Sequence, residues 1–171
     1  MGTVLRSVVA ASVVGGVVGG LVGAGVMSAA HALASKVTRP AESKQKADSN
    51  EKEEDATVKV ADALVRRTRG RPLADDAKPV AGNVVHYGFG GTIGLLYGAV
   101  APFAPLVTIG SGAGFGAAVW LGAHAIVVPA LGLARSPLRQ PASKEALEFV
   151  LHLASGVTVG VVWRAAIRIA R

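Results

Sequence analysis

Histidine supplies most of the chemistry available to this sequence, which has four histidines and no cysteine. An imidazole titrates near pH 6.5 and can also ligate metal ions. Glu148 precedes His152 by four residues, so the two share one face of a helix. We predict a polar cluster of these five residues, His31, His86, His124, His152 and Glu148.

Three interpretations of this cluster compete. Each imidazole could bond a neighbouring helix or lie at lipid-headgroup depth. The cluster could instead respond to protons, with Glu148 as the partner of His152. The third interpretation is a metal or haem site, but no HxxxH or ExxH spacing supports it. We therefore expect no metal site and no resident cofactor.

Other reaction classes find little support in the residues. The lack of cysteine excludes disulfides and thiol nucleophiles. There is no Gly-x-Ser-x-Gly motif, no P-loop and no GxGxxG motif, so we expect no catalytic residues and no enzyme. The net charge of +7 suits a chain beside anionic lipid, and we expect no nucleic acid and no identifiable small-molecule substrate.

Charged residues are segregated along the chain, and long uncharged segments separate them. Residues 79–134 form a run of 56 without Asp, Glu, Lys or Arg, and residues 7–35 form a run of 29. A soluble domain needs solvent-facing positions every few residues, whereas uncharged stretches of about 20 residues are typical of membrane-spanning helices. The lipid bilayer is therefore the expected partner.

We predict an all-α, multi-pass membrane protein, a bundle of four transmembrane helices packed through small residues. Residues 1–35 form the first helix, too long for a signal peptide, whose apolar core has about 15 residues at most. Residues 36–79 form a charged linker with a short amphipathic helix, and residues 80–171 form a three-helix membrane domain. Its helices cover about 80–101, 106–128 and 143 onward, because the prolines at 102–105 must turn the chain back.

Each histidine continues a row of residues spaced by four that also contains glycines. In an up-down-up-down bundle all four histidines fall at one end, on the side of the two loops. Glycines let membrane helices approach closely, within one chain or in a homo-oligomer. The predicted packing glycines are Gly15, Gly19, Gly23, Gly90, Gly94, Gly98, Gly112, Gly116, Gly156 and Gly160.

The basic residues indicate an orientation. The loops at 36–79 and 129–144 carry fourteen Lys and Arg, and the two ends of the chain carry four. The positive-inside rule therefore favours a cytoplasmic position for both loops.

A set of residues in fixed order also resembles a known family. The set comprises His86-Tyr87, Tyr97-Gly98, a Pro-containing turn, Gly112 to Gly116, Trp120, His124, Pro129, Leu131-Gly132-Leu133, Pro137, Glu148 and His152. Over about residues 80–168 it resembles the YagU-like family of bacterial inner-membrane proteins, a domain of unknown function. The resemblance implies a small multi-pass protein without an assigned reaction, associated with acid tolerance. The alternatives are a small transporter or channel subunit, or a metal- or haem-binding accessory protein.

Overall fold

The computed structural model describes residues 2–45 and 55–170, and the side chains of residues 6–36 and 55–170. Every regular element in these ranges is helical. The long helices are α1 (Gly2–Gln45), α3 (Lys78–Val100) and α6 (Ala142–Ile169). The shorter elements are α2 (Ala56–Arg69), η1 (Pro105–Gly112), α4 (Ala113–Val119), η2 (Trp120–Val127), α5 (Val128–Ala130) and η3 (Pro137–Arg139).

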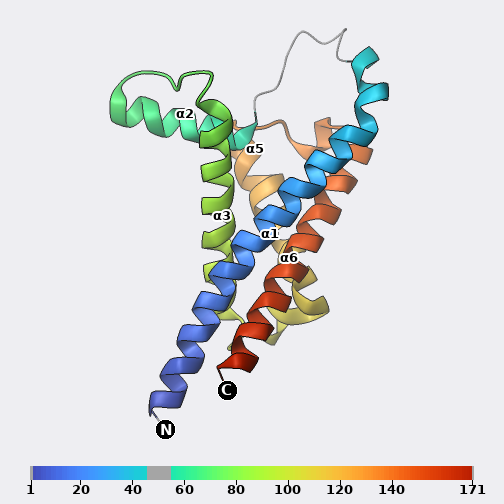
Figure 1. The fold of residues 1–171 in the computed structure, drawn as a ribbon. Helices are drawn as coiled ribbons and strands as arrows, with labels where there is room; N and C mark the ends of the chain where they lie inside the picture. Colours follow the sequence, from blue (N-terminus) through green and yellow to red (C-terminus); the bar gives the residue numbers. More distant parts are fainter. Residues whose placement is uncertain (1, 46–54, 171) are drawn as a thin grey trace.

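Helix α1 is the centre of the bundle, with α3 packed on one face and α6 on another (Figure 1). Two glycine rows on α1 make both contacts possible. A Cβ atom at Gly16 or Gly20 would collide with the backbone of α3, and one at Gly19 would collide with the backbone of Val159 on α6. Because these positions lack side chains, α1 approaches both neighbours at backbone contact.

The partner helices contribute glycines to the same interfaces. A Cβ atom at Gly90, Gly94 or Gly98 would meet the backbone of α1. On α6, Gly156 faces Gly112 and Gly116, at the start of the α4 segment. The predicted glycine rows therefore lie between helices of one chain. An oligomer formed through them would have to displace these contacts.

The helix predicted over 106–128 is not continuous, and this part of the prediction is wrong. The chain leaves helical geometry at Ile109, and φ is 58° at Gly110, 61° at Ser111 and 106° at Gly112. Left-handed backbone favours glycine, so two of the three positions suit the break. Gly112 lies against the backbone of Gly156, where a side chain would not fit. Further on, residues 120–127 form a π-helix.

The predicted linker contains helix α2, whose first turn is capped by Asp55 through a 2.8 Å bond from the Thr57 amide. Helix α2 packs on α3, where Gly82 leaves room for the Val58 side chain. Helix α1 also continues past the predicted limit of residue 35 to Gln45. Residues 46–54 of the predicted linker lie outside the described residues.

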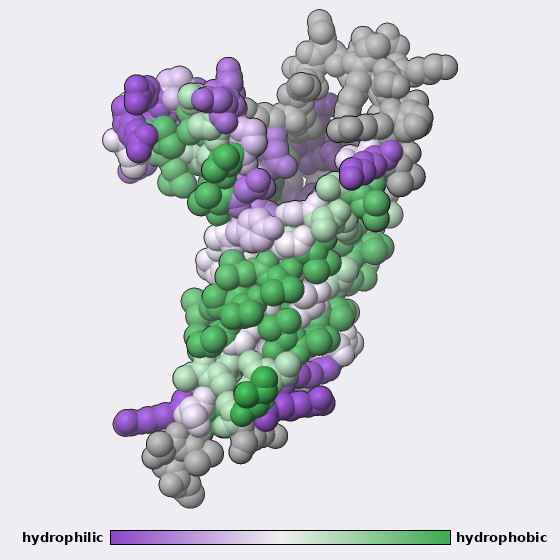
Figure 2. All heavy atoms as spheres, viewed as in Figure 1, coloured by the Kyte–Doolittle hydropathy of each residue, from purple (hydrophilic) through white to green (hydrophobic). Residues whose placement is uncertain are grey.

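Among the described residues, three segments are long and apolar enough to cross a membrane: Arg6–Lys36, Pro105–Ala130 and Ala142–Ile169. The predicted second span coincides with α3, which has 23 residues but is not one of these three; it contains Asn83, His86 and two tyrosines. Figure 2 shows a hydrophobic band around the middle of the bundle, with hydrophilic side chains gathered at its two ends.

Candidate functional site

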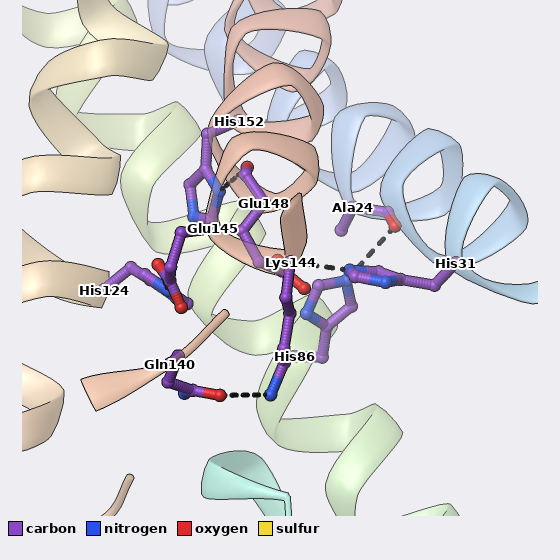
Figure 3. Close-up of polar contacts among 9 residues, drawn as sticks. All are labelled: Ala24, His31, His86, His124, Gln140, Lys144, Glu145, Glu148 and His152. Atoms are coloured by element: carbon purple, nitrogen blue, oxygen red, sulfur yellow. Dashed lines mark hydrogen bonds and ion pairs between the residues drawn. The ribbon is translucent and has the colours of Figure 1, made fainter. Parts of the chain in front are cut away.

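The four histidines come from four different segments of the chain and are found near one end of the bundle (Figure 3). His31 lies toward the end of α1, and His86 lies in the first half of α3. His124 lies in the π-helical η2, and His152 lies in the first half of α6. The antiparallel course of the segments explains why residues so distant in the sequence share one end.

His124 forms the best-defined pair of the site. Its Nε2 atom lies 3.1 Å from Oε2 of Glu145, and the two side chains are 26% and 12% exposed. The Trp120 ring stacks on the imidazole, with centroids 6.1 Å apart and planes 20° apart. Phe149 packs edge-on against the same indole. His124 is thus held between a carboxylate of α6 and an indole of its own segment.

The π-helix explains why His124 reaches α6. A π-turn bonds each amide to the carbonyl five residues earlier and thus adds one residue to the turn. The side chains beyond it are rotated relative to an uninterrupted α-helix. His124 lies inside this segment, directly after Trp120, Leu121, Gly122 and Ala123. Such turns are frequent at functional sites, because they re-aim a single side chain.

His152 joins the cluster through a different contact from the predicted one. Its Nδ1 atom lies 2.7 Å from the main-chain oxygen of Glu148, so Nδ1 is the protonated nitrogen that donates to this carbonyl. The carboxylate of Glu148 extends instead toward α1, where Oε2 is 3.5 Å from Nε2 of His31. The rings of His152 and His124 are edge-on, with centroids 5.6 Å apart.

Within the described part of the chain, His86 contacts a main-chain carbonyl and an aromatic ring and not a carboxylate. Its Nε2 atom lies 3.2 Å from the main-chain oxygen of Ala24 on α1, and its ring packs edge-on against Tyr87. The imidazole thus serves the α1–α3 interface as a donor to a carbonyl. Of the predicted cluster, His31, Glu148, His152 and His124 form a chain of contacts, and His86 stands beside it.

Two polar atoms at the site remain unsatisfied within the described part of the chain. Oε1 of Glu145 and Nε1 of Trp120 are buried and have no hydrogen-bond partner there. Buried polar groups are normally paired, and exceptions are often functional positions. Among the side chains of residues 6–36 and 55–170, no group of three His, Asp or Glu is placed to hold a metal ion together.

Residues 71–161 match a family described as proteins of unknown function, DUF1440. The match covers more than half of the 171 residues. The chain belongs to this family. The matched region includes α3, the broken segment and most of α6, and thus every cluster residue except His31. No curated protein and no solved structure matches the chain.

Sequence reasoning did not include Glu145 in the cluster, although it shares a helix face with Glu148 and His152 at spacings of three and seven. Gly16 and Gly20 belong to the two glycine rows that the sequence shows in the first helix, and they form the α1 side of the α1–α3 contact.

Proposed function

We propose that this protein is a non-enzymatic integral membrane protein of the YagU-like kind, located in a bacterial inner membrane. Its histidine–glutamate cluster links the packing of the helices to proton concentration, in a role in acid or envelope stress. The observation that carries the proposal is the pair of His–Glu contacts, which tie two separate segments to α6 at one end of the bundle.

The path of the chain supports four membrane crossings. Figure 1 shows both termini at one end of the bundle and the end of α1 at the other. The segment Pro105–Ala130 starts again at the end where the termini lie, so the chain must return between residues 45 and 105. Helix α3 makes this return along α1, and its 23 residues extend about 34 Å, enough for a hydrocarbon core of about 30 Å.

Protonation changes the strength of both pairs. A carboxylate bonded to an imidazolium forms a charge-assisted hydrogen bond, which is about twice as strong as a neutral one. A second proton on the neighbouring imidazole is opposed by like charge, because the rings of His124 and His152 lie 5.6 Å apart. Further titratable groups near the cluster, within the described residues, include His86, Lys144 and Asp55. A fall in pH would therefore tighten the contacts of α6 with α1 and with η2.

The prediction is tested with Trp120 as the reporter, because its ring stacks on His124. Replacing the second tryptophan, Trp163→Phe, leaves one indole in the chain. We expect its fluorescence to change with pH, and His124→Gln to abolish this change. His86→Gln is the matched control, because His86 donates to a carbonyl and should leave the titration unchanged.

An unchanged titration in His124→Gln would exclude the proton-responsive cluster. The link to stress is tested separately by survival at low pH. Cells with the triple change of His31, His124 and His152 to Gln should survive less well than cells with His86→Gln alone. Equal survival would remove the physiological part of the proposal and leave the titration standing.

A further inference from the structure

A second polar feature lies at the opposite end of the bundle, in the second half of α6. Arg164 is half-buried and crosses to the broken segment. Its Nη1 donates to Oγ of Ser111 at 2.8 Å, and its Nη2 donates to the main-chain oxygen of Thr108 at 3.1 Å. Both acceptors are neutral, so these bonds fix the guanidinium without balancing its charge.

Among the described residues, no Asp or Glu lies in the segments at this end of the bundle. All eleven Asp and Glu residues lie between residues 42 and 148. The first 41 residues, the turn at 101–112 and the last 23 residues contain none. Arg6 and Arg168 add further positive charge at this end, near the two termini (Figure 1). A partly buried cation whose hydrogen-bond acceptors are all neutral would be stabilised by an added anion.

A cavity of about 340 Å³ lies beside Arg164, between α1, η1 and α6. Its volume falls within the usual range for ligand sites, about 300–1,000 Å³. Val8, Pro105 and Ile167 supply apolar walls, and Thr108, Trp163 and Arg164 supply polar groups. An apolar cleft with one fixed cation is the arrangement expected for an amphiphilic anion.

The indole beside the cation is held in a fixed position. Nε1 of Trp163 donates to Oγ of Ser12 at 2.8 Å, and Ser12 donates to the main-chain oxygen of Gly98 at 2.6 Å. Ser12 is only 2% exposed, which makes this a buried link between α1, α3 and α6. Tryptophan is enriched where apolar membrane meets headgroups. The cavity thus lies at the depth where a lipid headgroup would be found.

We propose that this cavity binds a phosphate group, with Arg164 as the anion-binding residue and an anionic phospholipid as the source. Guanidinium binds phosphate through paired N–H donors, and only two of its five N–H groups are bonded within the described chain. Basic pockets between membrane helices suit anionic headgroups. The site is independent of the histidine–glutamate cluster, which lies at the other end.

The test uses the full chain, purified in a non-ionic detergent, with Trp120→Phe so that Trp163 alone reports. Three probes are titrated separately: short-chain phosphatidylglycerol, short-chain phosphatidylcholine and inorganic phosphate. We expect a saturable fluorescence change with phosphatidylglycerol at concentrations about tenfold below those needed for phosphatidylcholine. Arg164→Gln should weaken the binding of phosphatidylglycerol by about tenfold or more. Arg168→Gln, an exposed arginine one turn later, is the control and should change it by less than about threefold.

The outcomes separate the sources and the alternatives. Binding of inorganic phosphate as tight as that of phosphatidylglycerol would support the phosphate site and assign a soluble source. Equal binding of the two lipids, or equal losses in Arg164→Gln and Arg168→Gln, would overturn the proposal. If Arg164→Gln does not fold, native mass spectrometry of the unaltered chain decides. Bound phosphatidylglycerol in excess over phosphatidylcholine supports the site, and equal occupancy overturns it.

Discussion

Glu145 and Glu148 lie one turn apart on α6, yet their side chains serve different helices. Glu145 reaches His124 in η2, and Glu148 reaches His31 in α1. Each carboxylate therefore fixes one interface of α6. His152, near Glu148 on the same helix, bonds a main-chain carbonyl through Nδ1, which leaves its second ring nitrogen as an acceptor in the neutral imidazole. The candidate chemistry of each residue depends on which atom its side chain contacts. The residue type alone did not determine these contacts.

Asp62 offers a pH test outside the membrane-spanning segments. Its carboxylate accepts from Nε of Arg66 at 2.6 Å and from the amide of Leu73 at 2.7 Å. The hydrogen bond from Arg66, followed by that from Leu73, lowers the pKa of Asp62 below its usual value. The stability that these bonds contribute is therefore complete above the unfolded pKa of about 3.9. It is lost as pH falls through the lower, folded pKa.

We expect the Leu73 amide to lose protection from hydrogen exchange as pH falls through this range. Asp62→Asn should remove the pH dependence, because no titrating group then holds the amide. Asp75→Asn is the control: its carboxyl pairs with Lys78 at 2.7 Å and is 94% exposed. Retention of the same pH dependence in Asp62→Asn would show that another group controls the turn.

The distance between neighbouring helices depends on the positions of the glycine residues. Gly94 on α3 faces the carbonyl oxygen of Gly16 and the backbone of Gly20. Gly88, on the same helix, has open space where a Cβ atom would be. Glycine has the same intrinsic helix propensity at both positions. A difference in stability between alanine variants at the two positions therefore reports the packing of α3 on α1.

Gly94→Ala should lower the free energy of unfolding by about 1–3 kcal/mol, because the added methyl group forces the helices apart. Gly88→Ala should leave it unchanged or raise it by up to about 1 kcal/mol, since alanine is the better helix former. Thermal unfolding of the two variants in detergent gives the comparison. Equal losses of stability at both positions would mean that α1 and α3 do not meet at Gly94.

For the whole molecule, the proposed four crossings fix which parts lie on the same side. With four crossings, both termini share one side of the membrane, and the loops around Asp76 and Leu138 share the other. A crossing count of three would separate the termini. The absence of native cysteine makes single introduced cysteines clean probes.

We expect Ser7→Cys and Ile169→Cys to react with a membrane-impermeant maleimide in intact cells. Asp76→Cys and Leu138→Cys should react only after lysis if both loops are cytoplasmic, as the positive-inside rule favours. Ile169 and Leu138 are 87% and 97% exposed, so burial in the fold will not mask either one. Labelling of Ser7→Cys and Ile169→Cys from opposite sides would contradict four crossings.

Local properties of the sequence determined the helical class, the apolar segments and the spacing that aligns each histidine with glycines. Hydropathy and a spacing of four residues depend only on residues that are close together in the sequence, so both can be recognised without the fold. The tertiary structure decided the rest. The helical geometry is interrupted at 109–112, where Gly112 packs against the backbone of α6. His124 lies in the π-helical segment and contacts Glu145 of α6. Contacts between distant helices set both features, and no local pattern encodes the angle at which two helices cross.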